Sequence, residues 1–343
     1  MNLKKSLSIA LILGLAFITI WEWYVRSQGY LSEIDDNKAL WAIQRAKVDK
    51  LSSDDVLLLG SSRVHYDIQL NEWEEATGIR PIMLASDGTT PTPVFKEIVE
   101  NTDSKVTVFI GVAPALFFSQ PEKGFMWDRP TKRMKHYYDR TYAQRANHYL
   151  SLPLERTFSF LNASEEEWSD DIDLKTLVKN ITIGNRGPKP RPPINNFGFV
   201  DEDRNVTMFE KTQTDTTFAN GLIKMWMLGI ERRPTPVVDS VILYYQPLIQ
   251  KFKKRGGNVI FLRNPSSGKL RAKEDETYSR TICWDELLLQ TGLDGYHFED
   301  YPQLNQFTCP EESHLYTPDA RIYTKELVKI LIKNGVLDAK NSK

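Results

Sequence analysis

The apolar positions of this chain follow two different patterns. Near the N-terminus an apolar run extends from Leu7 to Trp21, broken only by Ser8, Gly14 and Thr19. Farther along, short and continuous apolar runs alternate with segments whose apolar residues recur at helical spacing. Short runs without polar alternation are typical of strands that are buried on both faces of a parallel sheet. The pattern therefore predicts an apolar N-terminal segment followed by an α/β domain.

Four apolar runs are the expected strands, and they are Val56–Leu59, Ile79–Ala85, Val106–Val112 and Asn258–Leu262. Helices are expected from an Asn71 cap to Gly78, from a Thr92 cap through Val99, from Val237 to Arg255, over Trp284–Leu289, and from Thr317 to Gly335. This alternation of strands and helices predicts a doubly wound, mainly parallel α/β sheet in a three-layer sandwich. We place this domain at residues 54–336.

The alternation stops between about Pro114 and Pro234. This segment is rich in tyrosine and contains the Pro/Gly-rich patch Gly187–Pro193. We interpret residues 114–235 as a long insertion into the α/β domain that covers or borders its site.

The N-terminal segment, residues 1–26, has the features of a membrane anchor. Lys4 and Lys5 precede the apolar run, and Trp21, Trp23 and Tyr24 resemble an aromatic belt at a membrane interface. Residues 7–25 approach the ~20 residues that a spanning helix needs, with Glu22 at the interface. The two lysines predict a cytoplasmic N-terminus and a domain on the far side of the cytoplasmic membrane. A cleaved signal peptide is the alternative, although no small-x-small cleavage site follows the run.

Residues 27–53 are polar and charged, and we interpret them as a helical stalk between the membrane and the domain. The whole chain has 343 residues and a formal net charge of −1, so it lacks the basic excess of a nucleic-acid-binding protein. No zinc-ligand spacing, G-x-G-x-x-G motif or P-loop is present, and we expect no cofactor. Nucleotide binding is accordingly the weakest of the functional interpretations.

Residues able to carry nucleophilic chemistry lie at opposite ends of the domain. Ser62 follows the first buried strand through Gly60 and Ser61, where a glycine permits a sharp turn. His314 lies near the end of the chain, and Glu311 precedes it by three residues. A serine needs a base within hydrogen-bond reach, and the base needs a group that orients it. We therefore predict a Ser62–His314–Glu311 triad, with Glu312 as the less favoured acid.

Neighbouring residues supply further candidates for the same site. The backbone N–H groups of Ser62 and Gly88 are the candidate oxyanion donors, because both residues follow buried strands. His65 competes with His314 as base but is expected to point away from Ser62 on the helix that follows. Arg63 and Asn264 are candidate substrate-binding residues, although an arginine after the serine more often pairs with an acid of the fold, such as Asp67.

With these residues the chain resembles the SGNH (GDSL-like) hydrolase superfamily, over about residues 55–112 and 236–335. Gly60-Ser61-Ser62 is similar to the first sequence block, which implies that Ser62 is the nucleophile. Gly88 falls where the oxyanion glycine of the second block is expected. Glu311-Glu312-Ser313-His314 is similar to the last block, which usually reads Asp-x-x-His. The third block usually supplies an asparagine, and Gly111-Val112-Ala113-Pro114 contains none.

The resemblance is greatest to the divergent, membrane-anchored branch that acts on cell-envelope polymers. It implies an esterase or O-acyltransferase that works on an acylated glycan and faces the periplasm or the cell exterior. A membrane-bound O-acyltransferase is the partner that this branch implies. The second interpretation is a catalytically inactive binding or scaffolding module in envelope polysaccharide assembly, which the missing asparagine favours.

The chain has two cysteines, Cys283 and Cys309. In an oxidising compartment they could form a disulfide that tethers the loop carrying Glu311 and His314. Two separate buried thiols are the alternative, and the sequence leaves both open.

Overall fold

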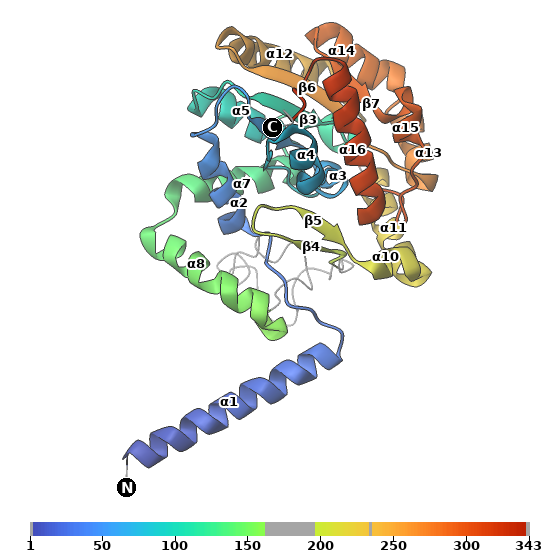
Figure 1. The fold of residues 1–343 in the computed structure, drawn as a ribbon. Helices are drawn as coiled ribbons and strands as arrows, with labels where there is room; N and C mark the ends of the chain where they lie inside the picture. Colours follow the sequence, from blue (N-terminus) through green and yellow to red (C-terminus); the bar gives the residue numbers. More distant parts are fainter. Residues whose placement is uncertain (1–2, 162–195, 233–234, 341–343) are drawn as a thin grey trace, which may run out of the picture. The chain divides into compact units, whose positions relative to one another are not determined.

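The computed structural model describes residues 3–161, 196–232 and 235–340 (Figure 1). The chain divides into two compact units. The first unit contains Met1–Asn37 and Arg140–Asn196, and the second contains Lys38–Asp139 and Phe197–Lys343. All of the candidate site residues named above belong to the second unit.

The second unit is built on a five-stranded sheet with the order β2-β1-β3-β6-β7. Its strands are β1 (Val56–Leu59), β2 (Ile82–Met83), β3 (Thr107–Gly111), β6 (Asn258–Arg263) and β7 (Gly295–His297). All four neighbouring pairs are parallel. The α/β class and the parallel sheet are thus as predicted from the sequence, and β7 is the strand of this sheet that the sequence analysis missed.

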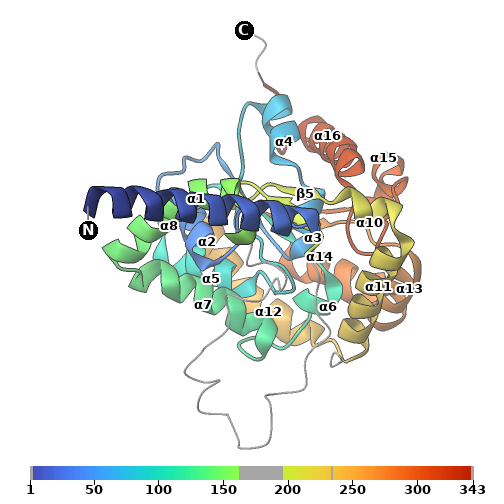
Figure 2. The ribbon, with the colours of Figure 1, turned by 90° about the horizontal axis from the view of Figure 1, so that it is seen from below.

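Alternate residues of each strand feed two apolar cores, one on either face of the sheet. Leu57 and Leu59 join one core, whereas Val56 and Leu58 join the other. The first core includes residues of α2 (Lys38–Val48), α5 (Thr92–Asn101), α12 (Val238–Lys254) and α14 (Glu286–Thr291). The second includes residues of α3 (Ser62–Asp67), α4 (Leu70–Thr77) and α16 (Thr317–Lys333). Figure 2 shows α5 and α12 on one side of the molecule and α4 and α16 on the other.

The proposed stalk over residues 27–53 is wrong for the part that forms α2. Trp41, Ala42 and Val48 are fully buried in the first apolar core. Arg45 on the same helix is also buried, because its guanidinium contacts both carboxylate oxygens of Glu97 at 2.8 and 2.6 Å. A buried ion pair thus gives this helix a polar composition, although it is part of the domain.

Two helices begin one or two residues earlier in the structure than their predicted caps indicate. The helix α4 begins at Leu70, and the side chain of Asn205 accepts its first N–H at 2.8 Å. A residue distant in sequence therefore does the capping that was assigned to Asn71. The helix α5 includes Thr92 and has Pro91 at its N-cap.

Residues 114–235 do not form a single insertion. Helices α6 (Pro114–Phe117) and α7 (Phe125–Asp139) belong to the second unit, and so does the antiparallel hairpin of β4 (Gly198–Val200) and β5 (Val206–Met208). Helices α10 (Glu210–Thr214) and α11 (Thr216–Glu231) complete this part. The Gly187–Pro193 patch lies outside the described residues. The remaining elements of the second unit are α13 (Gly268–Thr277), η3 (Thr281–Asp285), η4 (Phe298–Asp300) and α15 (Pro302–Asn305).

The first unit contains α1 (Leu3–Ser27), α8 (Tyr142–Thr157) and η1 (Ser159–Leu161). Of the helices in residues 3–161, 196–232 and 235–340, α1 alone is long and apolar enough to cross a membrane. No residue of α1 is buried. Its length and composition are those expected of an N-terminal anchor.

The two cysteines are free and buried. Of the two alternatives left open by the sequence, the structure therefore has two separate buried thiols and not a disulfide. Cys283 belongs to the apolar core on one face of the sheet and Cys309 to the core on the other face. The sheet therefore lies between the two thiols. Burial raises the pKa of Cys283 to about 11, which keeps it protonated and unreactive.

The helix that carries Ser62 lies very close to the ends of β1 and β3. A Cβ atom on Gly60 would lie 2.5 Å from Cγ2 of Val64, and a Cβ atom on Gly111 would lie 2.1 Å from the same methyl group. Only glycine at both positions lets Val64 pack over the two strand ends. These glycines therefore determine how closely α3 approaches the sheet.

We predict that Gly111→Ala destabilises the protein by about 1–3 kcal/mol, because the new methyl group overlaps a stiff β-branched side chain. Adding Val64→Ala should restore part of that loss. Gly221→Ala is the matched control, because no atom lies within 4 Å of its added Cβ. Denaturant unfolding of the detergent-solubilised protein measures all three. Equal effects of Gly111→Ala and Gly221→Ala would contradict the steric argument.

Candidate functional site

Ser62 is the first residue of α3 and is partly exposed at the carboxyl end of β1. Its N–H has no acceptor within the helix, as is general for the first residues of helices. The strand and the close-packed Val64 position the backbone, so the Ser62 hydroxyl is presented at the edge of the sheet. This is the placement that the strand–glycine–serine pattern predicted.

The structure brings Ser62, His314 and Glu311 together. The Ser62 Oγ atom lies 2.7 Å from Nε2 of His314, and Nδ1 of His314 lies 3.0 Å from Oε1 of Glu311. The same oxygen accepts the backbone N–H of His314 at 2.5 Å. Glu311 is fully buried and His314 nearly so. The carboxylate thus fixes Nδ1–H of the ring and leaves Nε2 free to take a proton from Ser62.

A tryptophan from α11 holds the other oxygen of the triad carboxylate. Trp226 Nε1 donates to Oε2 of Glu311, and its ring centroid lies 5.6 Å from that of His314. The rings of Tyr66 and Phe197 lie 5.0 and 5.3 Å from the imidazole. The sequence analysis missed these three residues. Trp226 and Phe197 come from the segment without clear periodicity, so only the presence of aromatic residues there could have indicated a role.

The loop that carries His314 is held by hydrogen bonds to two helices, α3 and α13. The carboxylate of Asp67, the last residue of α3, accepts the Leu315 N–H at 2.9 Å. Glu312 has a positive φ of 70° and its Oε2 accepts the Leu270 N–H at 2.9 Å, at the start of α13. Glu312 therefore anchors the loop and faces away from His314, which agrees with the choice of Glu311 as the acid.

The second candidate oxyanion donor, Gly88, lies in a loop fixed beside the end of β1. The Ser86 N–H donates to the Gly60 carbonyl at 3.0 Å. The Asp87 carbonyl accepts from Arg129 at 3.0 Å, so the Gly88 N–H of the same planar peptide points away from Arg129. His65 contacts the Asp87 carboxylate at 3.0 Å through Nδ1. As expected from the sequence, His65 is engaged elsewhere and does not compete with His314.

The two candidate substrate-binding residues, Arg63 and Asn264, are both engaged within the fold, and Arg63 pairs with an acid as the alternative interpretation anticipated. The guanidinium of Arg63 is buried and contacts Glu274 at 2.7 and 3.2 Å. The side chain of Asn264 is also buried and donates to the Arg63 carbonyl at 3.2 Å. The acid that pairs with Arg63 is thus Glu274, contributed by α13, rather than the nearby Asp67.

Glu274 binds two buried guanidiniums at once, because Arg263 also contacts it at 2.7 Å. Burial alone would raise the pKa of Glu274, but the charges of Arg63 and Arg263 outweigh burial and lower the pKa to about 2. This ion-pair network joins α3 to β6 and α13. Its role is to hold the helix that carries Ser62.

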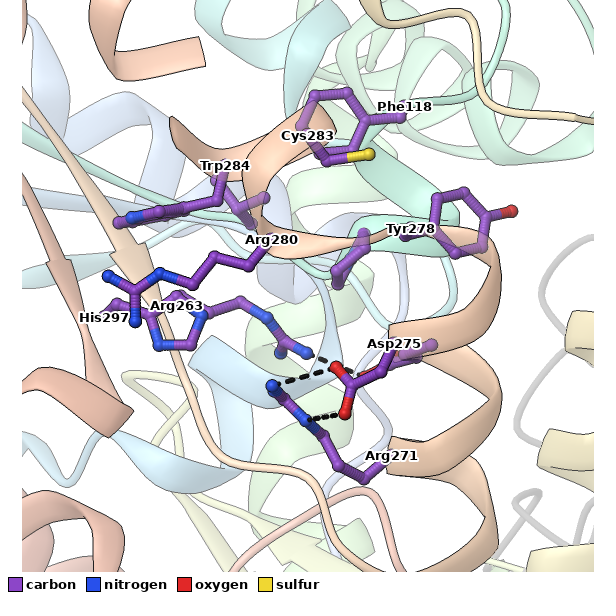
Figure 3. A pocket seen from close by; sticks show the side chains of 12 residues that line it. Phe118, Arg263, Arg271, Asp275, Tyr278, Arg280, Cys283, Trp284 and His297 are labelled. Carbon is purple, nitrogen blue, oxygen red and sulfur yellow. Dashed lines mark hydrogen bonds and ion pairs between the residues drawn. The ribbon is translucent and has the colours of Figure 1, made fainter. Parts of the chain in front are cut away.

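A small cavity lies beside this network, at the ends of β3, β6 and β7 (Figure 3). Its volume of about 20 Å³ admits one water molecule and is too small for a sugar. Figure 3 shows Arg280 beside His297, whereas the guanidinium of Arg263 points away from them, in keeping with its contact to Glu274. Burial and the three neighbouring arginines, Arg263, Arg280 and Arg271, lower the pKa of His297 to about 2, so the ring is neutral. This cavity is separate from the Ser62–His314 pair.

No protein-family model matches this chain, and no curated protein matches it. These comparisons therefore add no support for a function to what the geometry shows. The residues that this geometry joins are a serine hydroxyl, a histidine ring and a buried carboxylate. Such a set is suited to covalent acyl transfer.

A buried carboxyl group beside the site makes stability depend on pH. Burial raises the pKa of Asp67 to about 7, and its Oδ2 atom has no hydrogen-bond partner among the described residues. The folded protein therefore keeps a proton that the unfolded chain releases near pH 4. This contribution to stability is complete below about pH 4 and is lost as the pH rises toward 7.

We predict that Asp67→Asn removes this pH dependence while keeping an acceptor for the Leu315 N–H. The variant should be more stable than the parent protein at pH 8, and the advantage should disappear at pH 4–5. Unfolding curves of both proteins at the two pH values test this. An advantage of the same size at both pH values would show that Asp67 does not titrate in this range.

Proposed function

We propose that this protein is a serine esterase or O-acyltransferase that uses a Ser62–His314–Glu311 triad. The observation that carries the proposal is the continuous chain of contacts from Ser62 Oγ through the His314 ring to Glu311, at 2.7 and 3.0 Å. Ser62 and Glu311, at the two ends of this series of contacts, are 249 positions apart in the sequence. Only the fold brings them together. Its order, serine early with acid and histidine late, is one of those in which triads are built.

The chemistry follows from the positions of these side chains. His314 Nε2 removes the proton from Ser62 as its oxygen attacks the carbonyl carbon of the ester. The resulting positive charge on the imidazole is stabilised by Glu311, which is itself held by Trp226. The protonated His314 then donates its proton to the departing alcohol, which leaves an acyl group on Ser62. Water or a sugar hydroxyl, activated by His314, releases the acyl group.

Two backbone donors support the negative oxygen of the intermediate in this proposal. They are the N–H groups of Ser62 and Gly88. The segment after β3, Val112-Ala113-Pro114, offers no asparagine as a third donor. Losing one such donor typically costs about 10²–10³ in rate, so two donors are compatible with a slow enzyme.

The resemblance to the membrane-anchored branch of the SGNH hydrolases supports the choice of substrate. We propose an acylated cell-envelope or extracellular glycan, with the domain on the periplasmic or outer side of the cytoplasmic membrane. A membrane-bound O-acyltransferase is the partner we propose. The apolar helix α1 supports attachment to the membrane.

A non-catalytic binding or scaffolding role is the second candidate, and the absent asparagine favours it. The two candidates differ in what they require of Ser62. An enzyme needs a reactive hydroxyl, whereas a scaffold needs only the shape of the α3 turn.

We predict that a fluorophosphonate probe labels Ser62, because His314 raises the nucleophilicity of its hydroxyl. Labelling should disappear in Ser62→Ala and in His314→Ala. Ser61→Ala is the matched control, because Ser61 is buried and its side chain makes no cap hydrogen bond. Peptide mass spectrometry identifies the labelled residue. Labelling that persists in Ser62→Ala, or none in the parent protein, would favour the scaffold.

We also predict slow hydrolysis of small acetyl esters that depends on Glu311. The variant Glu311→Gln should lower kcat by about 10³–10⁴-fold, because an amide favours the wrong tautomer of His314. Trp226→Phe keeps the ring contact and removes the donor, so it should lower kcat by about 10-fold, as expected for one hydrogen bond to a charged group. Initial rates at saturating ester test both. A Glu311→Gln variant with unchanged kcat would remove Glu311 from the mechanism.

A further inference from the structure

The helix α8 in the first unit exposes most of its apolar residues. Its inner side is marked by His148 and Leu152, which are 5% and 7% exposed. Leu150 and Leu154 are 71% and 49% exposed. Each lies two residues beyond an inner residue, which in an α-helix is about 200° around the axis. The outward side of α8 is therefore largely apolar, with Asn147 and Thr157 as its exposed polar residues.

The rest of this outward face has the same character. Ala143 and Ala146 lie on it at helical spacing from Leu150, and both are exposed. At its edge are Tyr142 and Tyr149, with exposed fractions of 88% and 61%. Exposed arginines at positions 145 and 156 lie beyond the tyrosines, on the same side of the face. An apolar stripe bordered by tyrosine and arginine is typical of helices that lie in a membrane interface.

The C-terminal end of α8 is attached to the end of the apolar helix α1. The Glu22 carboxylate accepts the N–H groups of Ser159 and Phe160 at 2.9 and 3.2 Å. Arg26 donates to the Thr157 carbonyl at 2.9 Å. The end of α8 is therefore held at the level of α1 where the apolar sequence gives way to charged residues. That level is the surface of any bilayer that α1 crosses.

The direction of α8 also fits a membrane surface. Figure 1 shows α8 at an angle to α1, with the end of α8 near the end of α1. A helix held at that point and inclined to a transmembrane helix can follow the surface of the bilayer. Both helices belong to the same unit, and the contacts of Glu22 and Arg26 join them.

We propose that α8 is an interfacial helix whose outward face, defined by Ala143, Ala146, Leu150 and Leu154, inserts into the bilayer that α1 spans. The occupant of the face is lipid at the boundary between headgroups and acyl chains. The tyrosines lie at headgroup depth, and the arginines extend toward the phosphates. The chain is then attached to the membrane at two places, by α1 and by the surface helix.

The test places a polarity-sensitive fluorophore at position 150, through Leu150→Cys, in the full-length protein reconstituted into phosphatidylcholine–phosphatidylglycerol vesicles. Leu289→Cys is the matched control, because Leu289 is an equally exposed leucine on α14, with an exposed fraction of 76%. The native thiols, Cys283 and Cys309, are buried. Lipids that carry a doxyl group on the acyl chain quench a label that lies in the bilayer. Iodide in the buffer quenches a label that lies in water.

The label at position 150 should be quenched by the doxyl lipids and should be several-fold less sensitive to iodide than the label at position 289. A second reporter, Leu154→Cys, should behave like position 150. Strong iodide quenching at both α8 positions would place the face in water and overturn the proposal. Protection from both quenchers would also overturn it, because a second copy or another segment of the chain would then cover the face.

Discussion

The close approach of α3 to the sheet is the constraint on which the candidate site depends. Val64 packs over the Cα atoms of Gly60 and Gly111, at the adjoining ends of β1 and β3. The helix that follows has only six residues, so it spans about 9 Å. Ser62 is at one end of it and Asp67 is at the other. One short helix therefore both presents the hydroxyl and, through the Leu315 N–H, holds the loop that carries the base.

Charged side chains stabilise this arrangement from two sides. Arg63 on α3 shares Glu274 with Arg263 at the end of β6, and Glu312 binds the first turn of α13. Removing one partner of such a pair destabilises the protein more than replacing both partners by apolar residues, because the remaining charge stays buried without a partner. The network thus makes the position of α3 depend on residues that are distant in sequence and do not touch the triad.

The sequence predicted the parallel sheet and the contacts among Ser62, His314 and Glu311 because both leave local patterns. Continuous apolar runs mark strands that are buried on both faces, and the glycine before Ser61 and Ser62 marks a sharp turn. The Glu311-x-x-His314 spacing lets one carboxylate reach both the backbone and the ring. These features depend on neighbouring residues, so a single sequence is sufficient to predict them.

The features that the sequence did not predict depend on long-range pairing. The polar composition of α2 concealed a core helix, because Arg45 is neutralised by Glu97, which is 52 positions away. Trp226 and Phe197 contact the triad from a segment without clear periodicity. An acid of the fold was anticipated as the partner of Arg63, but the sequence indicated the nearby Asp67 and not Glu274, which is 211 positions away. In each case the partner that gives a residue its role lies in another element.

The central claim is that the Ser62 hydroxyl, activated by His314, accepts an acyl group. Its most direct measurement is the acyl-enzyme itself, trapped by rapid acid quenching after brief exposure to an activated acetyl ester and located by peptide mass spectrometry. The account predicts acetylation of Ser62 that forms in the parent protein and is lost in His314→Ala. Acetylation that is confined to other residues, or that forms on Ser62 equally well without His314, would contradict it.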